Sequence, residues 1–183
     1  MRIDRILKSL LIVILISAID INISEINAQT KTPTLDKTYK NDVYKISYPN
    51  GWRVDDSKVN NADLFLFSPL KAGDNYSENI NVLIQDLKGM DMDLEKYKKI
   101  SENQFATVLS NSKILESKII NTKGKNYYTL SFSYPQGEFN LKGTSICYIK
   151  NEKAYLVTFT ALETTYIEYK EIGEKILMTF EFI

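Results

Sequence analysis

Histidine is absent from all 183 residues of the sequence, and this absence removes more chemistry than any other feature of the composition. Without histidine there is no Ser-His-Asp triad, no Cys-His nucleophile pair and no zinc site with an imidazole ligand. Cysteine occurs once, as Cys147, so no disulfide can form within the chain. The stability of the fold must therefore come from a hydrophobic core.

An excess of either charge is also missing, because 23 basic residues balance 23 acidic ones. A balanced chain has no overall field that would concentrate phosphates, which argues against nucleic acid as a partner. The seven glycines form no phosphate-binding loop. The spacing from Gly137 to Gly143 is one residue too long for a Walker motif, and Thr144 stands where that motif has lysine. No cofactor is expected.

The N-terminus has the features of a secretory signal. Arg2, Arg5 and Lys8 precede an apolar run over residues 10–19. A ten-residue helix spans about 15 Å, half of the roughly 30 Å hydrocarbon core of a bilayer. We therefore predict a signal peptide at residues 1–28, cleaved after Ala28, and export to the periplasm or beyond the cell. An uncleaved N-terminal anchor is the alternative, and the mature chain should contain no transmembrane span.

The mature chain is predicted to begin with a flexible leader at residues 29–41, which is rich in Thr and Lys, carries Pro33 and lacks periodicity. One domain at residues 42–183 follows, as expected for this length. Apolar residues then alternate with period two in several segments, which predicts half-buried strands. In one of them Ile80, Val82 and Ile84 alternate with polar residues such as Asn81 and Gln85. Residues 64–67 are apolar at every position and predict a strand buried on both faces.

Two segments change to helical periodicity. Residues 93–109 carry apolar side chains at three- and four-residue spacing, and Asp91 or Asp93 can cap the first turn. A second helix is predicted after Thr165, which with Glu168 fits a capping box. Strands in a meander with two segregated helices indicate an α+β fold built on one antiparallel sheet.

Nearly all of the mature chain, including a strand and a helix within residues 82–105, resembles the PsbP-like superfamily, which includes the PsbP proteins of photosystem II, bacterial PsbP-like proteins and the DcrB lipoproteins. Two stretches carry most of this resemblance. The first is Tyr-Lys-Ile-Ser-Tyr-Pro-Asn-Gly-Trp-Arg-Val at residues 44–54, and the second is residues 155–182, with Ile-Leu-Met-Thr-Phe at 176–180. The resemblance implies an α/β/α sandwich around a bent antiparallel sheet and an exported accessory protein without known catalysis. Because histidine and a lipobox cysteine are missing, no functional residue is carried over.

Some residues could carry chemistry, but simpler roles explain each of them. Asp91, Asp93 and Glu95 could ligate a hard cation such as calcium, although helix capping accounts for them without a metal. The Ser-x-x-Lys spacing of residues 110–113 lacks its companion motifs. Cys147 lies in a predicted strand and should pack as a small apolar side chain. We therefore expect no catalytic, cofactor-binding or metal-binding residue.

The best candidate for a contact surface is the long polar loop at residues 69–79. It contains Gly73, Asp74, Asn75 and Tyr76, and loops of this length are usually functional or mobile. The only tryptophan, Trp52, follows a Pro-x-Gly turn and is predicted to be a core residue.

The composition favours a non-enzymatic, exported binding or accessory protein, expected to be a monomer, whose partner is an unknown protein or envelope component. A carrier of a small apolar ligand or lipid is the first alternative, and it would need a cavity between sheet and helices. A hydrolase that uses carboxylates alone is the second, and it would need two acids facing each other in a cleft.

Overall fold

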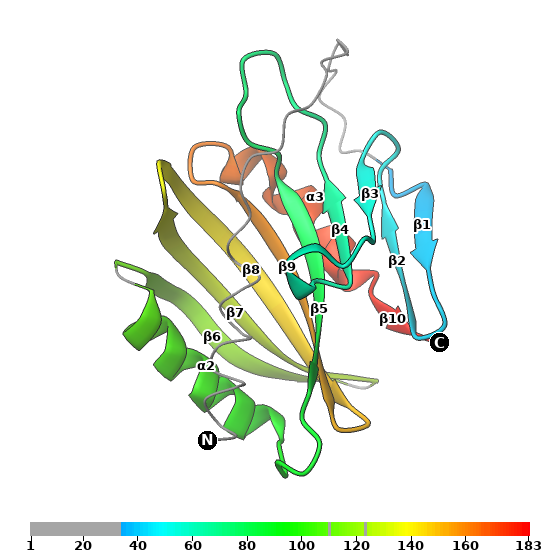
Figure 1. Ribbon diagram of the computed structural model, residues 1–183, viewed down its shortest axis with the longest axis vertical. Helices are drawn as coiled ribbons and strands as arrows, with labels where there is room; N and C mark the ends of the chain where they lie inside the picture. Colours follow the sequence, from blue (N-terminus) through cyan, green and yellow to red (C-terminus); the bar gives the residue numbers. More distant parts are fainter. Residues whose placement is uncertain (1–33, 110, 123) are drawn as a thin grey trace.

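The computed structural model describes residues 34–109, 111–122 and 124–183 (Figure 1). The predicted signal peptide lies outside these residues. A seven-stranded sheet has the strand order β3-β4-β5-β9-β8-β7-β6, and a smaller sheet has the order β1-β2-β10. All strand pairs are antiparallel. The bounds of the elements are β1 (Lys37–Lys40), β2 (Tyr44–Tyr48), β3 (Arg53–Asp55), η1 (Val59–Asn61), β4 (Leu64–Phe67), β5 (Asn79–Asp86), α2 (Leu94–Val108), β6 (Lys113–Thr122), β7 (Lys125–Gln136), β8 (Phe139–Lys150), β9 (Lys153–Leu162), α3 (Tyr166–Met178) and β10 (Glu181–Phe182).

The predicted α+β architecture is confirmed. α2 begins after Asp93, whose side chain accepts a hydrogen bond from the backbone amide of Lys96 at 2.8 Å. All four residues of β4 are buried, as their apolar character predicts. β7, β8 and β9 form the expected meander, and β6 precedes it with an irregularity at Leu115.

The small sheet differs from the single sheet that the periodicity predicts. β1 lies within the segment interpreted as a flexible leader, and it pairs with β2 over its whole length. Tyr39 of β1 packs against the core, as does Phe182 of β10. β1 has four residues, which is too short for alternation to be read from the sequence.

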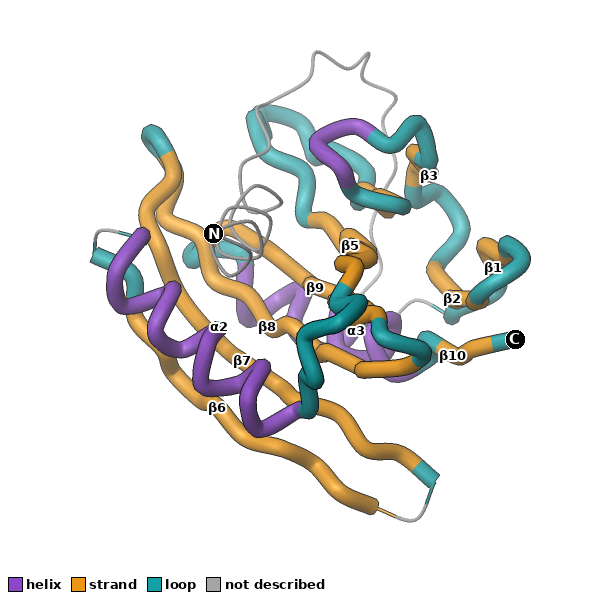
Figure 2. Tube along the Cα trace, turned by 60° about the horizontal axis from the view of Figure 1, so that its bottom comes forward, coloured by secondary structure: helices purple, strands orange, loops and turns teal. Residues whose placement is uncertain are grey.

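The buried apolar residues of the described chain form three clusters, one on one face of the large sheet and two on the other. α3 and the small sheet cover one face, where Trp52 is 9% exposed within the core, as predicted. α2 lies on the opposite face, along β6 and β7 (Figures 1 and 2). The molecule therefore has the layered α/β/α arrangement that the resemblance implies.

α3 approaches the sheet closely because Gly173 has no side chain. A Cβ at this position would lie 2.6 Å from the ring of Phe159 in β9. The helix thus contacts the aromatic ring with its backbone.

The predicted capping box at the start of α3 is wrong. The Thr165 hydroxyl donates to Glu78 Oε1 at 2.5 Å instead of capping the helix. The carboxylate of Glu168 is paired with Lys71. A buried acceptor outside the helix therefore competes successfully for the hydroxyl that the local pattern assigns to the cap.

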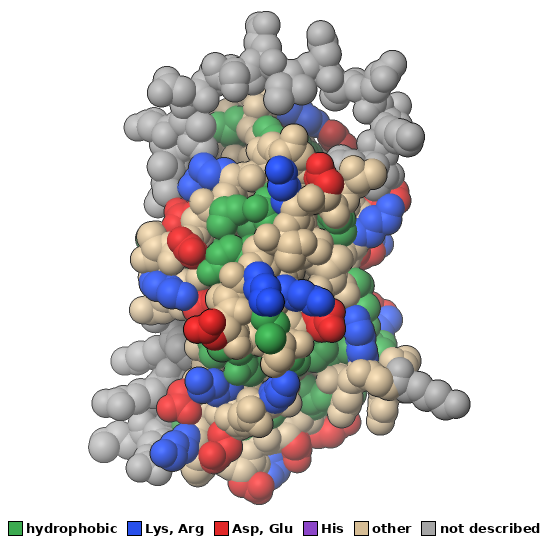
Figure 3. Space-filling model, turned by 90° about the vertical axis from the view of Figure 1, so that its right-hand side faces the viewer, with side chains coloured by type: hydrophobic (Ala, Val, Ile, Leu, Met, Phe, Trp, Pro, Cys, Tyr) green, Lys and Arg blue, Asp and Glu red, His purple; other side chains and the backbone are tan. Residues whose placement is uncertain are grey.

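Within the described ranges, no helix is both long and apolar enough to cross a bilayer. Lys and Arg side chains are interspersed with Asp and Glu over the side of the molecule shown in Figure 3. No single charge dominates that side, in keeping with the balanced composition.

Candidate functional site

The face of the large sheet that carries α2 is only partly covered by that helix. α2 contacts β6 and β7, and no described helix lies over β8, β9 and β5 on this side (Figure 2). A sheet face beside a helix is a common place for a ligand site.

A pocket of about 40 Å³ lies between α2 and this face. Its apolar walls come from Leu83, Phe105, Leu130, Phe132 and Leu156. α2 also contributes Tyr97 and Ser101 to the lining. The pocket therefore lies at the edge of α2, between this helix and the strands that the helix does not cover.

The floor of the pocket is polar and crosses three neighbouring strands. Asn81 of β5 is opposite Thr158 of β9, which is opposite Ser145 of β8. Thr158 Oγ1 donates to Ser145 Oγ at 3.0 Å. These three residues are each at most 9% exposed. We call this row, Asn81, Thr158 and Ser145, the polar floor.

Two buried amide side chains, one of which lines the pocket, have atoms without hydrogen-bond partners among the described residues. Asn81 Oδ1 has none, and neither do the two amide atoms of Gln104, which lies on α2 three residues after Ser101. By contrast, the Tyr97 hydroxyl donates to Gln85 Oε1 at 2.7 Å. An unpartnered buried polar group costs about 1–3 kcal/mol. A ligand that supplies the missing hydrogen bonds would recover this free energy.

The lining can bind but offers little for proton transfer. No acidic or basic side chain lines the pocket within the described part of the chain. Burial raises the pKa of the Cys147 thiol, which keeps it protonated and a poor nucleophile. Burial likewise holds the pKa of Tyr97 well above its ordinary value. The paired carboxylates that a carboxylate-only hydrolase needs are not found at this site.

Reasoning from the sequence missed these residues. The alternation in β5 predicts that Asn81 and Gln85 face solvent, yet they are 4% and 5% exposed. The sequence feature that could have revealed the polar floor is a polar residue within each of three strands, β5, β9 and β8, that are neighbours in the sheet. That signal could not be used before the strand order was known.

The predicted contact loop joins β4 to β5. Gly73, Asp74 and Asn75 are exposed, whereas Tyr76 is partly buried, with its ring 5.4 Å from that of Phe139. The Tyr76 hydroxyl accepts a hydrogen bond from Asn79 Nδ2 at 3.3 Å. The loop is therefore tied at its C-terminal end and presents its first three candidate residues to solvent.

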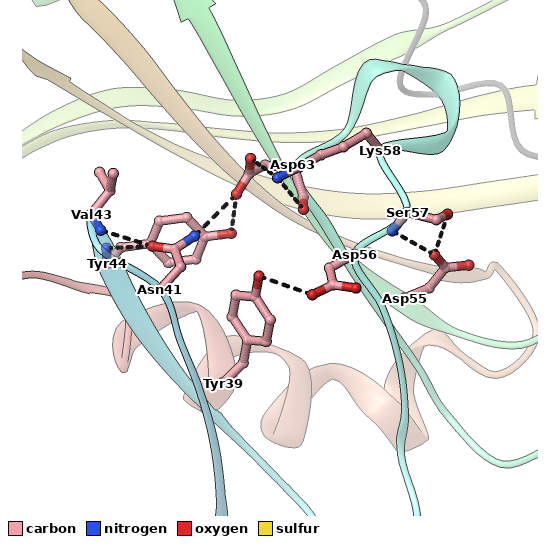
Figure 4. A network of polar contacts seen from close by, with 9 residues as sticks. All are labelled: Tyr39, Asn41, Val43, Tyr44, Asp55, Asp56, Ser57, Lys58 and Asp63. Atoms are coloured by element: carbon pink, nitrogen blue, oxygen red, sulfur yellow. Dashed lines mark hydrogen bonds and ion pairs between the residues drawn. The ribbon is translucent and has the colours of Figure 1, made fainter.

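A second polar network ties the small sheet to the loop before β4 (Figure 4). Asp63 Oδ2 accepts from the Tyr44 hydroxyl at 2.7 Å and from Asn41 Nδ2 at 3.3 Å. Lys58 pairs with the other carboxylate oxygen of Asp63. Every member of this cluster has a protein partner, so the network has a structural role.

Glu78 is the one fully buried carboxylate among the described residues, and it lies where the β4–β5 loop meets the start of α3. It is 2% exposed and accepts hydrogen bonds from Ser68 and Thr165, at 3.0 and 2.5 Å. Burial raises the pKa of Glu78 above its ordinary value. Its partners are hydroxyl groups, so it acts as a tie between the loop and the helix.

The calcium alternative at the start of α2 finds no support. Asp93 caps the helix, while Asp91 Oδ2 lies 2.7 Å from Lys96 Nζ. Among the residues described, no three Asp, Glu, Cys or His side chains come together as a metal site. Ser110 of the Ser-x-x-Lys spacing lies outside the described residues, and Lys113 begins a strand, so this spacing is not helical.

Solved structures of other proteins have the same architecture. A sequence search of curated proteins finds no match. Among solved structures, cyanobacterial PsbP (CyanoP) from Synechocystis sp. PCC 6803 has a TM-score of 0.61 at 15% identity, covering 86% of this chain and 99% of its own.

Two further structures have the same fold. LpqN of Mycobacterium tuberculosis, a protein involved in cell envelope biogenesis, has a TM-score of 0.60 at 14% identity, covering 76% of this chain and 82% of its own. PA94 of Pseudomonas aeruginosa, described as a putative regulator of unknown function, has a TM-score of 0.56 at 12% identity, covering 78% and 94%.

The sequence profile of the PsbP family matches residues 36–182, which span both sheets and both helices. This match includes the segments at residues 44–54 and 155–182, whose resemblance to the family the sequence already suggested. The chain belongs to the PsbP family.

Proposed function

We propose that this protein is a non-enzymatic accessory protein that is exported and binds a ligand or partner through the pocket beside α2. Membership of the PsbP family supports the accessory role. Balanced charge and the absence of histidine support a binding function over catalysis. The observation that carries the proposal is the polar floor, where Asn81 Oδ1 is buried without a partner among the described residues.

The size of the pocket argues against the lipid-carrier alternative. An engineered cavity that binds benzene has a volume of roughly 150 Å³, whereas this pocket has about 40 Å³. A whole acyl chain does not fit such a space, although one end of a larger molecule does. The carboxylate-only hydrolase is not supported, because no acid lines the pocket in the described ranges.

The proposal is tested by expressing the tagged full chain in its own host and recovering it from the envelope fraction. N-terminal sequencing shows whether cleavage occurs after Ala28. Co-purifying proteins and lipids are then identified by mass spectrometry for the wild type, Asn81→Leu, Ser145→Ala and Ser131→Ala. Ser131 is the matched control, because it also pairs with a threonine hydroxyl, that of Thr144 at 3.0 Å, but on the opposite face of the sheet.

We expect one species that is retained by the wild type and by Ser131→Ala but is lost from the two pocket variants. Equal recovery from all four proteins, or no species above background, would overturn the proposal. If the chain is found only in the cytoplasm, the proposal that the protein is exported is wrong.

A further inference from the structure

The charge, size and hydrogen-bonding pattern of the pocket restrict what can enter it. We propose that the pocket binds an uncharged carboxamide group, presented at the end of a ligand or by an Asn or Gln side chain of a partner. This inference rests on the proposed binding function and names the chemistry that the same site would recognise.

Size sets the first limit. One water molecule needs roughly 10–15 Å³ of such space, so the pocket of about 40 Å³ has room for about three atoms of that size. A carboxamide has three heavy atoms beyond its attachment point. A carboxylate, an amidinium and an isopropyl group have similar shapes, and the remaining arguments separate them.

Charge excludes the ionic groups. None of the described residues that line the pocket is acidic or basic. A carboxylate would be buried without a cation, and an amidinium or guanidinium without an anion, which is strongly unfavourable. The occupant is therefore neutral.

Hydrogen bonding excludes the apolar group. Asn81 Oδ1 is a buried acceptor that lacks a donor among the described residues. At the other end of the polar floor, Ser145 Oγ accepts from Thr158, so its own hydrogen is free to be donated. The site thus offers one acceptor and one donor, and an isopropyl group would leave both unused.

Spacing favours a carboxamide over a hydroxyl. Asn81 and Ser145 lie two strands apart, and neighbouring strands are about 4.8 Å apart, so their backbones are separated by about 10 Å. A hydroxyl would have to reach both groups with one oxygen. A carboxamide has its donor on the nitrogen and its acceptor on the oxygen. The separation of these two atoms adds to the length of two hydrogen bonds of about 2.9 Å each, so a carboxamide can span a wider gap between Asn81 and Ser145 than a hydroxyl can.

The test compares three fragments of one shape and three charges: acetamide, acetate and acetamidinium. The ¹⁵N-labelled chain recovered from its host is titrated with each, and amide shifts of residues in β5, β8 and β9 are followed by NMR. For so small a ligand we expect acetamide to bind in roughly the millimolar range. Acetate and acetamidinium should bind at least about 10-fold more weakly, because each buries an unpaired charge.

Three variants sharpen the result. Asn81→Asp should reverse the preference in favour of acetamidinium, because it puts a carboxylate where the neutral acceptor was. Asn81→Leu, which keeps the size of the side chain, should abolish acetamide binding and keeps the test decisive if the Asp variant fails to fold. Ser145→Ala should weaken acetamide binding by about 3–10-fold, whereas the matched Ser131→Ala should not change it.

The source of the carboxamide is separated with capped Gly-Gln-Gly and Gly-Glu-Gly peptides. Tighter binding of the Gln peptide than of acetamide indicates a partner's side chain, and equal binding indicates a free ligand. Equal affinity for all three fragments, or no loss in Asn81→Leu, overturns the carboxamide assignment. If the carboxamide assignment fails while Asn81→Leu still loses the species captured from the envelope, the proposed binding function stands. If acetamide binds as expected but no captured species is lost from Asn81→Leu, the proposed binding function fails and the carboxamide assignment stands.

Discussion

At the scale of single residues, Asn79 and Asn81 are two asparagines on the same face of β5, but their surroundings differ. Asn79 Nδ2 donates to the Tyr76 hydroxyl and to the Ser77 carbonyl, whereas Asn81 Oδ1 has no described partner. We expect Asn81→Leu to raise the free energy of unfolding by about 1–3 kcal/mol, because it removes an unsatisfied buried group. Asn79→Leu should lower it by about 1–2 kcal/mol, because its hydrogen bonds are lost.

Urea unfolding of the two variants beside the wild type measures both changes. A decrease in stability for Asn81→Leu would mean that this amide is already satisfied in the free protein, and the main evidence for a ligand at the polar floor would be lost.

Glu78 should make stability depend on pH. Because burial raises its pKa above the ordinary 4.5, the folded protein keeps a proton that the unfolded chain releases. The free energy of unfolding should therefore fall as the pH rises from about 4.5 through the raised pKa, with a slope of at most about 1.4 kcal/mol per unit. Glu78→Gln should remove this part of the slope.

The measurement is the urea midpoint at intervals between pH 4 and pH 8. Glu168→Gln is the control, because its side chain is 58% exposed and it should leave the slope intact. An identical pH profile for Glu78→Gln and the wild type would show that the carboxyl group titrates normally.

At the scale of elements, the start of α3 depends on Thr165 more than on Glu168. Thr165→Val removes the hydrogen bond to the buried Glu78 carboxylate and should cost about 1–3 kcal/mol. Glu168→Gln should change stability by less than about 0.5 kcal/mol, because its ion pair with Lys71 is exposed. Thermal or urea unfolding distinguishes this arrangement from a capping box, in which the Glu168 variant would also lose stability.

The longer elements could be predicted from the sequence because each buries one face or both, and apolar residues therefore recur along it in a regular pattern. α2, β4 and the meander of β7, β8 and β9 each show it over enough residues to be recognised. β1 could not be predicted, because it owes its conformation to pairing with β2. The same holds for Thr165, whose partner Glu78 lies far away in the sequence.

The candidate site was harder to predict than the fold. The polar floor draws on β5, β8 and β9, and its residues become neighbours only through the strand order. Asn81 on its own has the pattern of a solvent-facing residue. Cys147 and Trp52, by contrast, were correctly predicted to be buried, because a single apolar residue in a strand or beside a turn needs no distant partner for that inference.

At the scale of the whole molecule, the two sheets should unfold together. Tyr44 and Ile46 of β2 share a core with α3 and the large sheet, and Tyr44 also donates to Asp63. Trp52, the only tryptophan, lies in that core. Fluorescence of Trp52 and far-UV circular dichroism should therefore give the same urea midpoint.

Tyr44→Phe should shift both midpoints together, with a loss of about 1–3 kcal/mol, because Asp63 loses a hydrogen bond to its charge. Two separate transitions, with fluorescence changing before circular dichroism, would show instead that the small sheet and α3 detach as an independent unit.

The separation of the core beneath α3 from the polar floor has an evolutionary consequence. α3, Trp52 and the small sheet hold one face together without using any residue of the polar floor. A substitution at the polar floor therefore leaves the packing of that core unchanged. Recognition at the polar floor can therefore change during evolution without disturbing the core beneath α3.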